Sequence, residues 1–249
     1  MDEISRKQIN IRDNYNSVIE RITKSARNAG RNPEDIRLVV VTKTHPVEVI
    51  QFVIDAGATD LGENYVEVAI PKIQALTINR TIRWHMIGHV QSRKAQSVCE
   101  YFQYVHSVDS VKLGERLSRF AQALDILLPV WLEFNVGGED SKSGWDIGIE
   151  ENWKNILPEI ERILALPNLT ILGAMTIPPF SSNPEASRPY YHRLRKFQEY
   201  LIDHFQLTGF RQLSIGMSSD FEVAIQEGSS CVRIGQAILG PRITRQEDA

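Results

Sequence analysis

The sequence predicts an α/β protein built as a single (β/α)8 TIM barrel, and three observations support this fold class. Short apolar runs of strand length alternate with longer stretches of helical periodicity along the chain. Eight such runs occur, and the first is continuously apolar, which is typical of a parallel strand covered on both faces. The length of 249 residues suits one barrel of about 250 residues. We therefore expect one domain over 1–249, with an open doubly wound sheet as the alternative that a strand count would distinguish.

The strands are predicted from apolar and β-branched runs bounded by polar or turn-forming residues. Each run is followed by a stretch with the spacing of a helix, so all eight strands are expected to lie parallel. In chain order they are Leu38–Val41, Thr59–Gly62, Ile82–Ile87, Tyr104–His106, Pro129–Val136, Thr170–Met175, Gln212–Ile215 and Cys231–Ile234.

A long amphipathic helix is predicted before the first strand. Its apolar residues recur at spacings of three, four and seven, and Gly30 and Pro33 end it. They are Ile4, Ile11, Tyr15, Val18, Ile19, Ile22 and Ala26. The chain after the eighth strand is too short for a substantial helix, so we expect this N-terminal helix to complete the outer ring. The other helices are predicted at Val47–Ala56, Val66–Leu76, Ser92–Cys99, Val111–Leu124, Asn152–Leu164, around Tyr190–Leu201 and at Phe221–Glu227.

Composition narrows the function classes. The chain is 42% hydrophobic and 24% charged, which excludes a disordered protein, and its net charge of −3 offers no basic field for nucleic acid. Cys99 and Cys231 are isolated and the histidines lack metal spacing, so no metal site is expected. The N-terminus has no secretory signal, and the longest uncharged stretch, Leu164 to Pro184, contains four prolines. We expect a soluble, cytoplasmic protein with no membrane contact.

Lys43 is the first candidate functional residue. It directly follows the first predicted strand, at the carboxyl end where barrel enzymes hold their sites. By alternation it shares a face with Val39 and Val41, along which its stem can lie. Partial burial favours the neutral amine, which attacks aldehydes to form a Schiff base. A salt-bridged lysine at a strand end is the structural alternative.

The segment between the last two strands predicts an anion site. Ser219 and Glu222 have the spacing of a capping box, and Phe221, Ala224 and Ile225 form the buried face of the short helix that it would start. Unpaired amides at that start, preceded by the permissive backbone of Gly216, suit a phosphate, and barrel phosphate sites commonly lie here. A capped helix with no ligand is the alternative.

Strand eight carries a third candidate group. Gly235 lets backbone amides approach an anion closely, and Gln236 adds another amide. Arg233 lies on the opposite face from its strand neighbours, and a cation fixed on a core strand requires an acceptor. An internal carboxylate is the structural candidate for that acceptor, and a pyridine nitrogen is the functional one.

These features together describe a pocket for an aldehyde joined to a phosphate. Pyridoxal 5'-phosphate has both groups. A sugar-phosphate aldolase would also need a lysine and a phosphate site, so the combination leaves both ligands open.

Seven motifs, spread in order over nearly the entire chain, resemble the pyridoxal phosphate homeostasis protein family. They are LVVVTKTHP, LGENYVE, IRWHMIGHVQSRK, SKSGW, GAMTIPP, SIGMSSDFEVAI and VRIGQAILG. That family is similar to the N-terminal barrel domain of bacterial alanine racemase. The resemblance implies a racemase-type barrel that binds pyridoxal 5'-phosphate covalently and acts in vitamin B6 homeostasis, with effects on amino-acid and keto-acid pools.

The resemblance also assigns roles to individual residues. It implies that Lys43 forms the Schiff base and that Arg233 faces the pyridine nitrogen. The residues that it implies for phosphate are Ser218, Ser219, Gly235 and Gln236, the last standing where a small hydroxyl residue is common in the family. Asn64 and His85 lie in motifs that line the cofactor, although His85 could equally be a hydrogen-bonded core histidine. Met175 is expected in the pocket wall, with core packing as the alternative.

We expect a carrier and buffer of pyridoxal 5'-phosphate with no catalytic residue. An arginine does not protonate the pyridine nitrogen, so the ring stays a weak electron sink, and the covering domain of alanine racemase is missing from the sequence. The alternative is a slow amino-acid racemase that uses Lys43 alone or with Tyr65. Expected partners are the cofactor and pyridoxal-phosphate-dependent apoenzymes, and the expected oligomeric state is a monomer or a weak homodimer.

Overall fold

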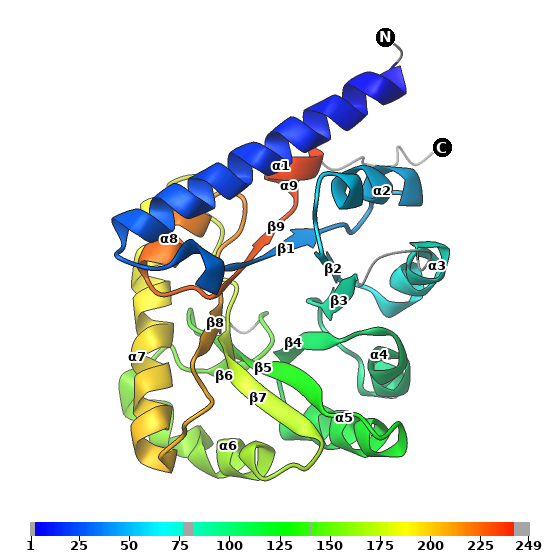
Figure 1. The fold of residues 1–249 in the computed structure, drawn as a ribbon. Helices are drawn as coiled ribbons and strands as arrows, with labels where there is room; N and C mark the ends of the chain where they lie inside the picture. The colour runs from blue at the N-terminus through cyan, green and yellow to red at the C-terminus, as the bar shows by residue number, and fades with distance from the viewer. Residues whose placement is uncertain (1–2, 77–81, 140, 242–249) are drawn as a thin grey trace, which may run out of the picture.

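A closed barrel of eight parallel strands forms the centre of the protein (Figure 1). The computed structural model describes residues 3–76, 82–139 and 141–241. Neighbouring strands pair in chain order, and pairing between β4 and β5 completes the ring, so the predicted barrel is confirmed and the open sheet is wrong. The barrel strands are β1 (Arg37–Val41), β2 (Asp60–Glu63), β3 (Arg83–Met86), β4 (Tyr104–Val108), β5 (Leu128–Asn135), β7 (Leu169–Met175), β8 (Gln212–Ser214) and β9 (Cys231–Ile234).

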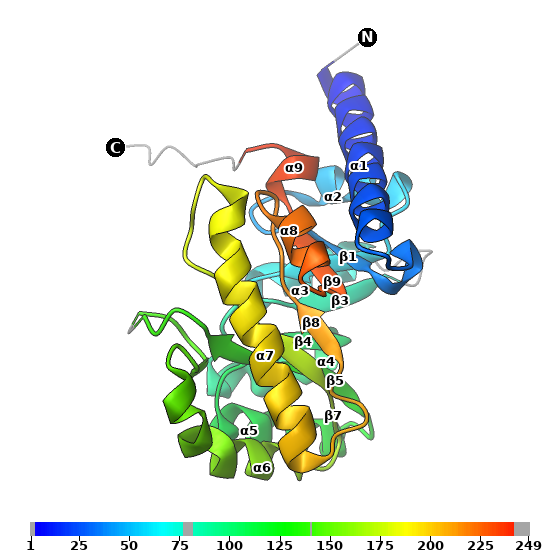
Figure 2. The same ribbon diagram turned by 90° about the vertical axis from the view of Figure 1, so that its left-hand side faces the viewer.

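Helices surround the barrel, one or more after each strand (Figures 1 and 2). They are α1 (Glu3–Asn28), α2 (Val47–Asp55), α3 (Val66–Leu76), α4 (Ala95–Tyr101), α5 (Val111–Ala123), α6 (Leu157–Leu164), α7 (Arg188–Phe205), α8 (Phe221–Gln226) and α9 (Gln236–Leu239). The helix expected over Asn152–Leu164 is split into a 3-10 segment, Glu150–Ile156, and α6. Pro158 explains the split, because a proline in the first turn of α6 has no N–H for a hydrogen bond to the preceding turn.

The N-terminal helix completes the outer ring, as predicted. α1 packs against α8, α9 and α2, and it buries Ile11, Val18 and Ile22. Asn14 Nδ2 donates to the carbonyl oxygen of Ile238 at 3.1 Å. Ile4 was expected on the same apolar stripe but is 67% exposed, because the first turns of α1 project past the barrel (Figure 1).

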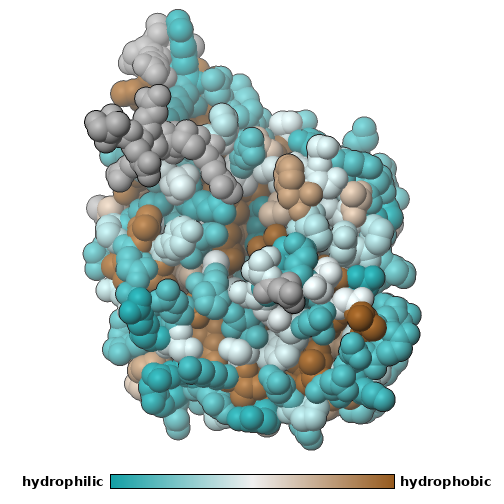
Figure 3. Space-filling view, turned by 180° about the vertical axis from the view of Figure 1, so that it is seen from behind, coloured by the Kyte–Doolittle hydropathy of each residue, from teal (hydrophilic) through white to brown (hydrophobic). Residues whose placement is uncertain are grey.

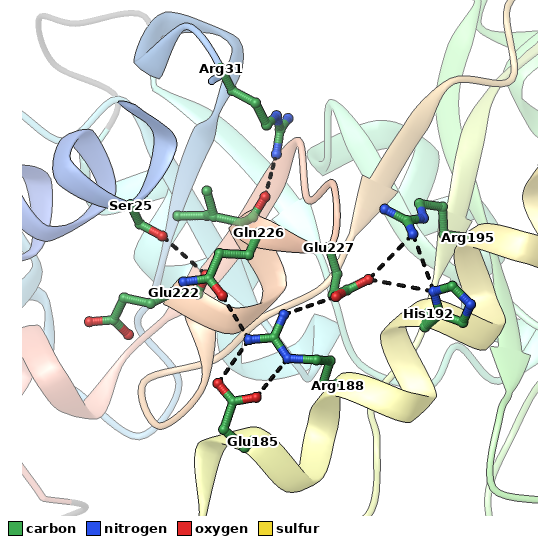
Figure 4. Close-up of polar contacts among 10 residues, drawn as sticks. Ser25, Arg31, Glu185, Arg188, His192, Arg195, Glu222, Gln226 and Glu227 are labelled. Carbon is green, nitrogen blue, oxygen red and sulfur yellow. Dashed lines mark hydrogen bonds and ion pairs between the residues drawn. The ribbon is translucent and has the colours of Figure 1, made fainter. Parts of the chain in front are cut away.

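Polar contacts hold α8 between α1 and α7 (Figure 4). From α1, Ser25 Oγ donates to the carbonyl oxygen of Glu222 at 3.1 Å. From α7, Arg188 donates to the side chains of Gln226 at 2.7 Å and Glu227 at 2.9 Å. The helix α8, which follows the loop after β8, is therefore held from both sides.

One strand was not predicted. β6 (Trp145–Asp146) pairs with the carboxyl end of β5, where Phe134 is opposite Trp145 and Asn135 is opposite Asp146. Two residues are too short for an alternating pattern to show in the sequence. The assignment of 1–249 to one domain stays a prediction. Among the described helices, none combines the length and apolar character that crossing a bilayer requires.

Candidate functional site

A cavity of about 270 Å³ lies at the carboxyl ends of β1, β2 and β9, on the face that Figure 3 shows from the front. In that view a hollow with apolar surface lies among hydrophilic side chains (Figure 3). Seven of the nine predicted site residues line the cavity: Lys43, Asn64, Ser218, Ser219, Arg233, Gly235 and Gln236. Segments that are distant in the sequence therefore meet at one mouth of the barrel, as parallel strands require.

A tight turn after β1 places Lys43 at the cavity. The amide of Thr42 donates to the carbonyl oxygen of Gly62 at 3.0 Å, and the amide of His45 donates to that of Thr42 at 3.2 Å. Between them Thr44 has φ +68°, a left-handed conformation that is uncommon for threonine. Lys43 is half-buried and lines the cavity.

A buried ion pair between Glu63 and Lys72, which the sequence analysis missed, holds the turn that carries Lys43. Lys72 Nζ, on α3, lies 2.8 Å from Glu63 Oε1 and donates to the carbonyl oxygen of Thr42 at 3.2 Å. Thr42 Oγ1 donates to the same Glu63 oxygen at 2.7 Å. Residues 42 and 63 immediately precede Lys43 and Asn64, so this cluster ties the two lining segments together. A lysine in register with the buried Val66 and Ala69 was the sequence signal for it.

The predicted capping box is wrong. The residue before α8 is Asp220, and no side chain caps the helix. Asp220 Oδ1 instead accepts from the amide of Met217 at 2.8 Å, which closes the loop over 217–220. Glu222 points away and pairs with Arg21 of α1 at 2.5 Å. Because Asp220 takes the capping position, Ser219 is left on the cavity lining rather than on the helix.

Ser218 links the two loops that were predicted to hold phosphate. Its Oγ accepts from the amide of Ala237 at 3.2 Å, so the loop before α8 is joined to α9. Gly235 brings α9 close to β1, since a Cβ there would lie 2.9 Å from the carbonyl oxygen of Val41. A side chain at position 235 would push these segments apart. Ser218 and Ser219 of one loop and Gly235 and Gln236 of the other thus line the same cavity.

Arg233 is 4% exposed and also lines the cavity. Its Nη1 donates to the carbonyl oxygen and to Oγ of Ser214, and its Nη2 donates to the carbonyl oxygen of Thr176 at 3.0 Å. The carboxylate acceptor considered as the structural alternative is wrong, because no carboxylate in the described ranges forms an ion pair with it. Burial lowers the pKa of Arg233, but an arginine stays charged in proteins.

Two predicted residues lie elsewhere. His85 is fully buried in the barrel interior, where it hydrogen-bonds to Asp60 and His106, so its placement is that of a core histidine. Met175 is also fully buried and does not line the cavity. Both sit on strands that contribute to the mouth, but strand alternation turns their side chains inward, below the lining residues.

The structure adds cavity residues that the sequence analysis missed. His45 is 6% exposed, and Ile177 and Phe180 belong to the loop after β7. Phe180 is 87% exposed and forms an apolar lip. Its place in a proline-rich loop directly after a strand was the available sequence signal.

The residues present fit pyridoxal 5'-phosphate. Lys43, Arg233 and the two loops line one cavity, where they would provide an amine for the aldehyde, a cation for the ring and donors for phosphate. In addition, Asn64 Oδ1 and His45 Nδ1 are buried without hydrogen-bond partners among the described residues. Buried polar atoms of native proteins are nearly always satisfied, so a polar ligand would complete this lining. Within the described parts of the chain, no group of side chains could hold a metal ion.

Comparisons with known proteins show the family to which the chain belongs. The family model described as "Alanine racemase, N-terminal domain" matches residues 13–242. A pyridoxal phosphate homeostasis protein of Aquifex aeolicus is 38% identical over 94% of this chain and 99% of its own. Proteins of the same description from Pseudomonas aeruginosa and Escherichia coli are 41% and 36% identical, over 93% of this chain and 96% and 97% of theirs.

Solved structures show the same fold. The chain is similar to an unknown protein from Bifidobacterium adolescentis, with TM-score 0.82, 32% identity and coverage of 96% and 97% of the two chains. It is similar to PipY of Synechococcus elongatus with pyridoxal phosphate bound, with TM-score 0.77, 31% identity and coverage of 88% and 100%. An alanine racemase of Clostridium difficile, 18% identical, shares the fold over 94% of this chain and 58% of the enzyme, with TM-score 0.66.

Proposed function

Because the chain belongs to the pyridoxal phosphate homeostasis protein family, we propose that it binds pyridoxal 5'-phosphate in the barrel-mouth cavity and acts as a carrier and buffer of this cofactor in vitamin B6 homeostasis. The observation that carries the proposal is the meeting of Lys43, Arg233 and the two donor-bearing loops around one cavity. Each of these groups matches a different part of the same ligand. Through the free cofactor, this role would affect amino-acid and keto-acid pools.

Lys43 holds the ligand covalently in this proposal. The bound cofactor would supply an aldehyde, and the Lys43 amine would condense with it with loss of water, so that the reactive aldehyde would be masked. Hydrolysis or transfer to another amine reverses the step. The Glu63–Lys72 pair keeps the turn that carries Lys43 in place, and so it orients the amine without touching the ligand.

The other groups bind the phosphate and the ring. The hydroxyls of Ser218 and Ser219, with backbone amides near Gly235 and Gln236, donate to phosphate at one end of the cavity. Arg233 would face the ring nitrogen, and Asn64 Oδ1 would accept a hydrogen bond from the ligand. A fixed cation opposite the nitrogen prevents its protonation, which restrains the electron-sink chemistry that the bound cofactor supplies.

A non-catalytic role agrees with the surroundings of the cavity. Tyr65, the second acid or base that a racemase would use, is 62% exposed and does not line the cavity. Phe180 at the lip is 87% exposed, so the site is not covered on that side. An uncovered site favours exchange of the cofactor with apoenzymes. Nothing in the described part of the chain favours the racemase or the sugar-phosphate aldolase over the carrier.

The cellular setting is part of the proposal. Cys99 and Cys231 are unpaired and buried, which suits a reducing compartment such as the cytoplasm. We expect the protein to work as a monomer or a weak homodimer.

Absorption spectroscopy and borohydride reduction test the proposed function. The wild-type protein mixed with pyridoxal 5'-phosphate should show the visible band of a Schiff base, and reduction should leave the ligand on the peptide that contains Lys43. Lys43→Ala should lose both, whereas Lys112→Ala, an exposed lysine on α5, should keep both. Covalent ligand retained in Lys43→Ala would refute the assignment. Exchange of the α-proton of an amino acid in deuterated water would favour the racemase.

A further inference from the structure

A continuous chain of hydrogen bonds crosses the barrel interior from Asp60 to Arg233. Asp60 Oδ1 lies 2.9 Å from His85 Nε2, and His85 Nδ1 lies 2.9 Å from His106 Nε2. His106 Nδ1 lies 2.7 Å from Ser214 Oγ, which accepts from Arg233 Nη1 at 2.5 Å. These side chains come from five different strands or strand ends, and each residue is at most 4% exposed. Only its last member, Arg233, lines the cavity.

All the hydrogen bonds between Asp60 and Arg233 donate in the same direction, and the groups at the two ends of the series determine which one. Asp60 is an ionised carboxylate, because hydrogen bonds from His85, Arg83 and Thr59 outweigh burial and lower its pKa to about 2. A carboxylate only accepts, so His85 must donate through Nε2. Burial lowers the pKa values of His85 and His106, which favours the neutral form of both rings.

The remaining bonds follow one by one. A neutral His85 that donates through Nε2 can only accept at Nδ1, so His106 donates through Nε2. His106 then accepts at Nδ1, and the hydroxyl of Ser214 must donate to it. Because the hydroxyl proton of Ser214 is donated to His106, Ser214 Oγ can only accept a hydrogen bond from Arg233. All four bonds therefore point from the guanidinium toward Asp60.

Stacking fixes the rings that carry these bonds. His106 stacks on Trp131 with ring centroids 4.1 Å apart, and His85 stacks on Tyr104 with centroids 4.5 Å apart. Rotation of either ring would break stacking and two hydrogen bonds together. The guanidinium of Arg37 lies over the Tyr104 ring, 4.6 Å from its centroid. The geometry is thus held by packing as well as by polarity.

We propose that Asp60, His85, His106 and Ser214 are positioning residues for Arg233, which they hold with its remaining N–H groups toward the ligand cavity. Three of the five guanidinium N–H groups are taken by Ser214 and Thr176. If Ser214 instead turned its proton toward Arg233, the guanidinium would lose an acceptor and shift. That the guanidinium meets a bound ring rests on the proposed function, but the direction of the chain does not.

Nuclear magnetic resonance of the ligand-free protein tests the direction. Long-range proton–nitrogen spectra should show both His85 and His106 protonated at Nε2 and not at Nδ1, and the Arg233 Nη signals should be resolved because the guanidinium is held on three acceptors. Asp60→Asn should give mixed tautomers at His85 and His106. Ser214→Ala should average the Arg233 signals, and Ser214→Thr, which keeps a hydroxyl, should restore them. His106 protonated at Nδ1 in the wild type would overturn the proposal.

Binding of pyridoxal 5'-phosphate tests the consequence for the ligand. Ser214→Ala should weaken binding about tenfold and shift the visible band, while Ser214→Thr should stay close to wild type. Ser118→Ala is the matched control, because Ser118 is a buried serine on α5 that bonds to the carbonyl oxygen of Pro167 and is not connected to Arg233. Equal effects from both alanine variants would show a merely structural role. Should Ser214→Ala not fold, Ser214→Cys provides the same comparison.

The two proposals fail separately. A wild-type protein that forms no band with pyridoxal 5'-phosphate refutes the proposed function, yet the tautomers and Arg233 signals of the ligand-free protein still decide the positioning chain. Conversely, suppose that pyridoxal 5'-phosphate gives a normal band and that the Arg233 signals are unchanged in both Asp60→Asn and Ser214→Ala. This result would refute the positioning role and leave the proposed function standing.

Discussion

Glu63 and Lys72 form an ion pair of 2.8 Å directly below the turn that carries Lys43, and both residues are more than nine-tenths buried. Lys72→Met should leave a buried carboxylate without its cation and lower the free energy of unfolding by about 3–5 kcal/mol. Urea unfolding measures this. The double variant Glu63→Gln, Lys72→Met should recover much of the loss, because no buried charge is then left uncompensated. A loss within about 1 kcal/mol for Lys72→Met would contradict the buried pair.

Gly235 lies in close contact with β1 at the cavity, and this contact can be tested by substitution. A Cβ at this position would lie 2.9 Å from the carbonyl oxygen of Val41, so Gly235→Ala should displace the loop that bears Gln236. We expect binding of pyridoxal 5'-phosphate to weaken by about tenfold or more. Gly209→Ala is the matched control, since a Cβ there would meet nothing within 4 Å. Titration by absorbance compares the two, and equal affinities would show that the contact is unimportant.

Glu133 on β5 makes stability depend on pH. Burial, with the nearby charge of Asp109, raises its pKa to about 7 from 4.5, and its Oε2 has no hydrogen-bond partner among the described residues. In the folded protein Glu133 keeps its proton up to a higher pH than it does in the unfolded chain. The free energy of unfolding is therefore highest below about pH 4.5, and it falls as the pH rises from about 4.5 to about 7. Glu133→Gln should therefore be more stable than wild type at pH 8, by up to about 3 kcal/mol, and nearly equal to it at pH 4. Chemical unfolding at both pH values measures the difference, and a variant less stable than wild type at pH 8 would show that Glu133 is ionised and satisfied.

The sequence was sufficient for the barrel because its information is local. Apolar runs and helical spacings predict each strand and helix separately, and parallel strands then bring Lys43, Asn64 and Arg233 to one mouth. The hydrogen-bonded series inside the barrel, from Asp60 to Arg233, could not be predicted from local patterns. His85 and His106 are on neighbouring strands, but whether their rings meet depends on barrel register, which no local pattern contains.

The loop before α8 shows the limit of motif spacing. Ser219 and Glu222 have the spacing of a capping box, yet Asp220 lies between them and its carboxylate takes bonds from Met217, Ser187 and Tyr191. The two partners from outside the loop lie about thirty residues earlier in the chain. Such a competition between a local and a tertiary partner can be decided only in the folded protein.

Ser219 leads to the last prediction, which separates phosphate binding from aldehyde capture. Ser218 Oγ already accepts from the amide of Ala237, so its removal would disturb both loops, whereas Ser219 is exposed on the cavity lining. Ser219→Ala should remove a hydrogen bond to a charged group, worth about 1.5–3 kcal/mol, and weaken binding of pyridoxal 5'-phosphate by about tenfold or more.

Pyridoxal, which has the aldehyde but no phosphate, provides the internal control for that variant. Its affinity for Ser219→Ala should equal its affinity for the wild type, because Lys43 and Arg233 are unchanged. Absorbance titration with both ligands measures the two ratios. Equal weakening for both ligands would mean that Ser219 shapes the cavity and does not bind phosphate, and no weakening for either would leave the phosphate to Ser218, Gln236 and the backbone amides.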